Sequence, residues 1–208
     1  MPWEGPSPPY RIETERLVVR CYEPSDAPLL KEAIDSSLEH LRPWMPWAHQ
    51  EPQTLEEKTE LIKRFRANFD SGDNFTCGIF SVDEAQVLGG AGLEPRIGPG
   101  GLEIGYWVRS SATRRGIATE SSAALTRVGF EVCGADRIEI RIEPRNVASL
   151  GVPRKLGFAE EATLRRRLPS PEGEPLRDMT IFTLFREDFG PSLAPGIQAF
   201  DARGETLL

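Results

Sequence analysis

The segment from Leu102 to Leu125, LEIGYWVRSSATRRGIATESSAAL, constrains the fold more than any other part of the chain. It begins as a strand-like apolar run, turns at Arg114, Arg115 and Gly116, and continues with small and apolar residues at helical spacing. A tight glycine turn between a strand and a helix leaves free backbone N–H groups and the positive end of the helix dipole at one point. Because two arginines lie beside these N–H groups, we interpret this turn as a diphosphate cradle. The alternative is a solvated basic loop, and the spacing matches neither the Walker loop nor the dinucleotide fingerprint.

The remaining elements follow from apolar periodicity. Alternation predicts strands over residues 16–22, 75–82, 85–95, 102–108, 136–142 and 179–185. Helical spacing predicts helices over residues 24–34, 54–69, 117–132 and 146–158.

Three details sharpen these boundaries. Ser25 or Asp26 is expected to cap the first helix, and Thr54 with Glu57 forms a capping box for the second. Pro153 has no N–H for the carbonyl of Ser149, so we expect it to bend or break the last helix.

The alternation of strands and helices predicts a mixed α/β fold with a largely antiparallel sheet. We expect residues 1–10 to form an N-terminal arm, 11–189 the domain, and 190–208 a C-terminal tail of little periodicity.

Composition excludes several classes of protein. Three widely spaced cysteines without a C-x-x-C pair argue against a disulfide framework or a zinc site, so we expect no metal and a cytoplasmic location. A net charge of −7 argues against general nucleic-acid binding and leaves room for a basic substrate. We also expect no membrane association, because no apolar run approaches the ~20 residues that span a bilayer, and the first residues lack the pattern of a secretory signal.

Four motifs occur in order along the chain: RLVVRCYEPSDA, LRPWMPW, LEIGYWVRSSATRRGIATE and RNVASLGVPRKLGF. With them the chain resembles the GNAT superfamily of acyl-CoA N-acyltransferases, and within it the RimJ/RimL branch, which acetylates N-termini of ribosomal proteins and related amines. The resemblance covers roughly residues 14–188 in the order of elements. It implies a single GNAT-type α/β domain, with a mixed, mostly antiparallel twisted sheet flanked by helices.

The resemblance implies that acetyl-CoA is the acyl donor. Its pyrophosphate is expected at the turn, and its pantetheine along the strand that precedes the turn, paired with backbone groups as an added strand would be. The chain departs from the usual pattern at three places. Thr113 stands where the turn commonly begins with Gln or Arg, and Gly151 with Pro153 stands where this branch normally keeps helix formers. Phe158 stands where many members use a tyrosine as the acid. The residues expected to contact the donor are Tyr106, Trp107, Val108, Arg114, Arg115, Gly116, Ile117, Ala118, Thr119, Asn146 and Ser149.

Direct attack of an amine on the thioester requires an oxyanion donor, a proton for the leaving thiolate and a base for the amine. The resemblance implies the backbone N–H near Val108 for the oxyanion and the hydroxyl of Ser149 for the proton. Asn146 and Ser149 have the alternative roles of a helix cap and a satisfied local hydroxyl. Glu103 is the first candidate for the base, acting through water, and Glu94 is the second; an ordinary solvent-facing strand glutamate is the alternative for Glu103.

Trp44 and Trp47 are candidates for the wall of the substrate groove, together with Glu94, although packing in the core is the alternative for both tryptophans. The expected reaction is acetyl transfer to a primary amine, preferably a peptide or protein α-amine. The alternatives are a small-molecule amine such as an aminoglycoside or polyamine, a CoA-binding module without catalysis, and an acyl-CoA enzyme of another kind. The expected partners are acetyl-CoA and the amine, and a homodimer is left open.

Overall fold

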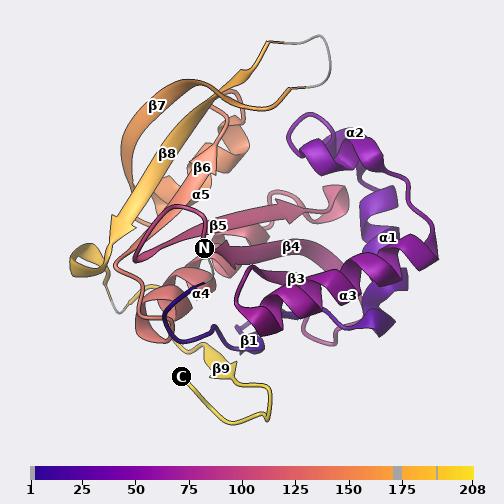
Figure 1. The fold of residues 1–208 in the computed structure, drawn as a ribbon, viewed down its shortest axis with the longest axis horizontal. Helices are drawn as coiled ribbons and strands as arrows, with labels where there is room; N and C mark the ends of the chain where they lie inside the picture. Colours follow the sequence, from indigo (N-terminus) through magenta and orange to yellow (C-terminus); the bar gives the residue numbers. More distant parts are fainter. Residues whose placement is uncertain (1–2, 171–174, 191) are drawn as a thin grey trace.

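The computed structural model describes residues 3–170, 175–190 and 192–208, which form one nine-stranded sheet with helices on both faces (Figure 1). The sheet has the order β7-β8-β6-β5-β4-β3-β2-β1-β9. The strands are β1 Arg11–Glu13, β2 Leu17–Cys21, β3 Phe75–Ser81, β4 Val87–Glu94, β5 Gly101–Val108, β6 Arg137–Ile142, β7 Ala159–Leu168, β8 Arg177–Phe185 and β9 Gln198–Phe200. The helices are α1 Ala27–Asp35, α2 Leu38–Leu41, α3 Leu55–Ser71, α4 Ile117–Glu131 and α5 Val147–Lys155, with short 3-10 turns η1 Pro24–Asp26, η2 Pro46–Gln50, η3 Ser110–Ala112 and η4 Arg186–Asp188.

Neighbouring strands run antiparallel except β5 and β6, which are parallel and joined through α4. A parallel pair needs a crossover connection, and α4 supplies it. The predicted mixed, mostly antiparallel α/β sheet is therefore confirmed.

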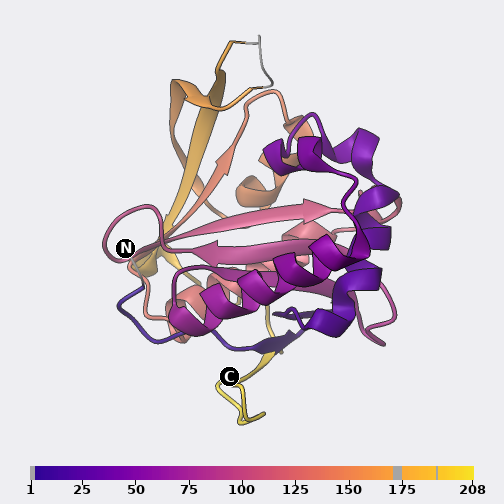
Figure 2. The same ribbon diagram turned by 45° about the vertical axis from the view of Figure 1, so that its right-hand side comes forward.

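The two faces of the sheet are covered by different helices because strand side chains alternate. Val18 on one face packs with α1 and with Ile62 of α3 in one core cluster. Val19 on the opposite face belongs to the main core, which includes the apolar side of α4. Figure 2 shows α1 and α3 together in front of the sheet. Consequently α4 begins on the far face from α1, at the end of the strand that leads into it.

Three strands were missed or misplaced by periodicity. β1 has three residues, and β7 reads AEEATLRRRL with mostly exposed side chains, so neither carries an apolar alternation. β9 lies in the segment expected as a tail, and this expectation is corrected because β9 pairs with β1. Ile197 and Ala199 are buried in the main core, so this end of the chain completes an edge of the sheet. The arm beside it is also tied down, since Tyr10 N–H donates to the carbonyl of Phe200 at 2.9 Å.

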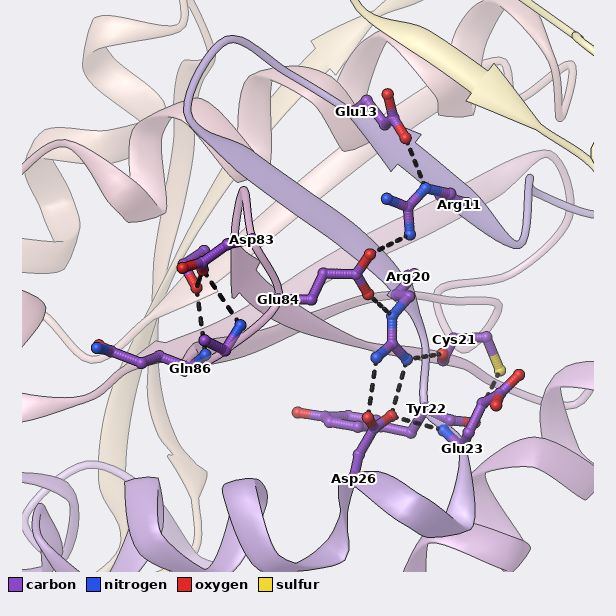
Figure 3. Close-up of polar contacts among 12 residues, drawn as sticks. Arg11, Glu13, Arg20, Cys21, Tyr22, Glu23, Asp26, Asp83, Glu84 and Gln86 are labelled. Atoms are coloured by element: carbon purple, nitrogen blue, oxygen red, sulfur yellow. Dashed lines mark hydrogen bonds and ion pairs between the residues drawn. The ribbon is translucent and has the colours of Figure 1, made fainter.

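The two predicted helix starts had different outcomes. The capping box of Thr54 and Glu57 at α3 is confirmed. Asp26 precedes α1 but makes no side-chain cap to it. Instead its two carboxylate oxygens accept from Arg20 at 2.7 and 2.8 Å (Figure 3). Glu84 of the β3–β4 turn also accepts from Arg20 and, at 2.7 Å, from Arg11. Asp26 is thus used to tie α1 to the first strands rather than to cap the helix.

Candidate active site

The site is built around a divergence of two strands. β5 pairs with β6 only at Gly101–Glu103, whereas β5 continues to Val108. On its other side β5 stays paired with β4, and Arg109 N–H donates to the carbonyl of Leu88 at 2.9 Å. Bonded and non-bonded pairs alternate in an antiparallel ladder, so Tyr106 and Val108 direct their N–H and C=O groups away from β4. The open edge of β5 therefore presents backbone donors and acceptors where an extended molecule can add as a strand.

This edge leads directly to the turn that the sequence singled out. Arg114 and Gly116 both have left-handed backbone, with φ of 60° and 81°, and α4 begins at Ile117. Gly116 is the residue before the helix and offers no side-chain cap. Within the described chain, the N–H groups of Ile117, Ala118 and Thr119 have no recorded acceptor, as expected for a first helical turn. The predicted free helix N-terminus behind a glycine turn is confirmed.

The charge at the turn is available to a ligand. Arg114 and Arg115 are exposed, and neither forms an ion pair with a described residue. Beside them is a hollow of about 360 Å³, lined by Arg115, Ile117 and Arg16 together with residues of the β3–β4 hairpin. Arg16 was not among the predicted site residues, although it is the first residue of the motif RLVVRCY. A third arginine, Arg16 of the β1–β2 turn, therefore lies beside the donor turn.

α5 brings Asn146 and Ser149 to the open side of β5. Asn146 Oδ1 accepts the backbone N–H of Ser149 at 3.2 Å and so caps the helix. Of the expected bend or break at Pro153, the break does not occur, because α5 runs through Pro153 to Lys155. The carbonyl of Ser149, which Pro153 cannot satisfy, accepts the hydroxyl of Tyr106 at 3.2 Å. Burial raises the pKa of Tyr106 to about 12, so this hydroxyl is protonated at neutral pH.

The two candidate bases lie side by side on β4 and β5, opposite each other in register. Glu103 is buried, and Arg96 donates to both of its oxygens at 2.9 and 2.6 Å. Arg141 lies 3.6 Å from Glu103 as well. Glu94 shares Arg96 with it through an ion pair. Burial raises the pKa of Glu94, and the nearby Glu103 raises it further, against the opposing effect of Arg96.

Trp107 lies on the same face of β5 as Glu103, because side chains alternate along a strand. Trp47 in η2 meets Trp107 edge-on, with ring centroids 5.8 Å apart. The indole of Trp107 covers Gly90 on β4, where an added Cβ would lie 2.4 Å from Nε1. Trp44 is half-buried and, among the described residues, joins no aromatic pair. Trp47 therefore packs against a site strand, whereas Trp44 has no aromatic partner in the part of the chain that the structure describes.

Other kinds of site have no basis in the described residues. They contain no group of three or more His, Cys, Asp or Glu side chains that could hold a metal ion. All three cysteines are free and buried, and burial raises the pKa of Cys21 to about 11. A thiol nucleophile therefore has no support. None of the described helices combines the length and the apolar character that crossing a membrane requires.

Comparison with known proteins gives a consistent result. Residues 16–159 match the acetyltransferase (GNAT) domain family. The chain is 26% identical over 160 residues to the putative ribosomal N-acetyltransferase YdaF of Bacillus subtilis (strain 168), covering 73% of this chain and 82% of that protein. It is 27% identical over 160 residues to the ribosomal protein uS5-alanine N-acetyltransferase of Escherichia coli (strain K12), covering 74% and 80%. The solved structure of Mycobacterium smegmatis RimJ in complex with CoA-disulfide is similar, with a TM-score of 0.75, 26% identity and 92% of each chain covered.

Proposed function

The chain belongs to the GNAT acetyltransferase family and is an acetyl-CoA-dependent N-acetyltransferase, and from this premise we propose that its acceptor is the α-amine of a peptide or protein. The relatives named for ribosomal-protein acetylation support this acceptor class. The observation that carries the donor side of the reaction is the open edge of β5 ending at the free N-terminus of α4. An extended donor with a diphosphate at its far end fits that combination.

The donor is proposed to be held by two sets of groups. Arg114, Arg115 and the first amides of α4 would bind the diphosphate, since charge-assisted hydrogen bonds and the helix dipole act there together. The open backbone groups of Tyr106 and the carbonyl of Val108 would pair with the pantetheine amides. Because Oδ1 of Asn146 is engaged as the helix cap, its NH₂ group is the part left to donate to the donor.

Acetyl-CoA supplies an activated thioester, and the protein must stabilise the charges that develop during transfer. The N–H of Val108 faces the open edge and is proposed as the donor to the oxyanion. The hydroxyl of Ser149 is proposed to give its proton to the leaving thiolate. Among the described residues this hydroxyl has no recorded hydrogen-bond partner, so it is free for that role. The hydroxyl of Tyr106 is already committed to the carbonyl of Ser149.

The base is proposed to be Glu94 rather than Glu103. Both carboxylate oxygens of Glu103 already accept hydrogen bonds from Arg96, so they are engaged within the protein and less available to a water molecule. Glu94 has a raised pKa because of burial, which brings it closer to the operating pH that suits a general base. A water molecule between Glu94 and the amine would complete the proton path.

The acceptor class follows from the free energy needed to neutralise the attacking amine. An α-amine has a pKa of ~7.7–8.0 and a lysine of ~10.4, so neutralising a lysine at pH 7 costs about 3–4 kcal/mol more. The site has one half-buried carboxylate of raised pKa, Glu94, with an arginine beside it that lowers this pKa. An α-amine costs much less free energy to deprotonate, because an appreciable fraction of it is already neutral at pH 7.

Two matched peptides test this proposal. One has a free N-terminus and no lysine, and the other is blocked at the N-terminus and carries a single lysine. We expect acetyl-CoA-dependent mass gain on the first peptide and a kcat/KM at least tenfold lower on the second. Gly116→Asp, which strains the donor turn, is the control for enzyme-dependent transfer. Preferential modification of the lysine peptide, or of a polyamine or aminoglycoside offered in competition, would contradict the acceptor class.

A further inference from the structure

Arg16 connects the start of β2 to the donor turn by several hydrogen bonds. Its Nη1 donates to the carbonyl of Arg115 at 3.1 Å, and its Nε donates to Glu120 Oε2 at 2.7 Å. The backbone N–H of Arg16 donates to the other oxygen of Glu120 at 3.2 Å. Thr14 adds a hydroxyl donor to that oxygen at 2.6 Å. Both oxygens of Glu120 are therefore bound from the β1–β2 turn, 104 residues away in sequence.

Glu120 creates an electrostatic problem for an anion site. It is the one acidic residue in the first turn of α4, where the free amides lie. An acidic side chain there favours the helix itself, because it faces the positive end of the dipole. The same charge repels a diphosphate bound to the same turn. The side chain of Glu120 is only 19% exposed, so water screens its charge less than that of a surface carboxylate.

Arg16 removes this repulsion and also fixes the turn. Its guanidinium forms an ion pair with Glu120, so the carboxylate is neutralised at short range. Its bond to the carbonyl of Arg115 orients the peptide plane between Arg115 and Gly116. In a trans peptide the C=O and N–H point in opposite directions, so the N–H of Gly116 is turned away from Arg16. An added Cβ at Gly116 would lie 3.2 Å from Arg16 Nη2, which shows how closely the guanidinium approaches the turn.

We propose that Arg16 is a positioning residue for the donor: by neutralising Glu120 and holding the carbonyl of Arg115, it makes the N-terminus of α4 able to accept the diphosphate of acetyl-CoA. This inference rests on the proposed donor site and adds a residue to it. Arg16 acts through Glu120 and the Arg115 peptide. Its effect is therefore specific to donors that carry the diphosphate.

The test uses the full chain and two donors. Arg16→Gln, Glu120→Gln and the double variant are compared for CoA binding by calorimetry. Each is also assayed with acetyl-CoA and with acetyl-pantetheine, which lacks the diphosphate and nucleotide. Arg127→Gln is the matched control, because Arg127 pairs with Glu131 at 3.0 Å and donates to a backbone carbonyl at 3.1 Å farther along the same helix. Arg16→Lys, which keeps the charge, provides a second variant if Arg16→Gln folds poorly.

Arg16→Gln is expected to raise the Kd for CoA about tenfold, the effect of one lost charge-assisted contact. Glu120→Gln alone is expected to leave the Kd near the wild-type value, and the double variant to regain most of the lost affinity. Arg16→Lys is expected to lie between wild type and Arg16→Gln. With acetyl-pantetheine, kcat/KM should not change in any of these variants. Arg127→Gln should match the wild type with both donors.

Three results would overturn the inference: an unchanged Kd in folded Arg16→Gln, an equal loss with both donors, or no recovery of affinity in the double variant. An equal loss with both donors would make Arg16 a structural residue only. The proposed function is tested separately. If CoA binds as expected but no peptide is acetylated, the acceptor assignment fails while the role of Arg16 stands.

Discussion

Tyr106→Phe is expected to destabilise the fold by leaving a carbonyl in α5 without its partner. The hydroxyl of Tyr106 satisfies the carbonyl of Ser149 at 3.2 Å, and Pro153 prevents the helix from doing so itself. A buried acceptor left unsatisfied costs ~1–3 kcal/mol. Ser149 is half-buried, so water recovers part of this cost and we expect a loss of about 1–1.5 kcal/mol in the free energy of unfolding.

Pro153→Ala supplies the missing N–H and provides the decisive comparison. In that background the helix can bond the Ser149 carbonyl by itself, so Tyr106→Phe should cost ~0.5 kcal/mol or less. The difference between the two backgrounds is a coupling free energy of about 0.5–1 kcal/mol, which a double-mutant cycle isolates. Urea unfolding followed by tryptophan fluorescence measures all four proteins, provided that the m-value stays constant.

Two controls sharpen this cycle. Tyr10→Phe removes a hydroxyl bonded to Asp70 at a distant place, so its cost should be the same with Pro153 or Ala at 153. The folded pKa of Tyr106 is raised to about 12, above its unfolded value, so its contribution is fully present below ~10 and is lost only as the pH rises through 12. The coupling should therefore be equal at pH 6 and pH 8. Equal costs of Tyr106→Phe in both backgrounds would refute the reasoning.

The remaining predictions concern the proposed site directly. Gly116→Asp adds a negative charge and a side chain at φ 81°, so calorimetry should show CoA affinity reduced by more than about tenfold in a folded variant. Ser149→Ala should lower kcat by ~10²-fold or less, with little change in CoA affinity; a wild-type kcat would assign the proton to water or another group. Glu94→Gln should remove the acidic limb of the pH–rate profile. In the wild type, the raised pKa of Glu94 places this limb at a higher pH than an ordinary glutamate would. If Glu103→Gln removes the limb instead, Glu103 is the base. Cys21 and the other two cysteines should resist alkylation in the native protein at pH 8, because burial raises their pKa and blocks access; rapid labelling would contradict their packing.

The sequence alone determined the parts of this protein that depend on local pattern. Alternation located β2, β3, β4, β5, β6 and β8, and the glycine turn into α4 was recognisable because an apolar strand, two arginines and a helical repeat follow one another directly. The motifs in their order also indicated the family. These features are readable because the direction of a side chain, inward or outward, repeats with the period of its own element.

Only the tertiary structure decided which side chains meet. Arg96 selects Glu103 rather than Glu94 for the bidentate pair, although nothing in the strand pattern separates the two carboxylates. Tyr106 reaches the Ser149 carbonyl across 43 residues, and this contact explains how α5 tolerates Pro153. β9 joins the sheet through backbone pairing with β1. Its three residues are too few to show an apolar periodicity in the sequence. In each case the partner is set by strand register and helix packing, because contacts between distant segments depend on the whole sheet and not on the residues around either member.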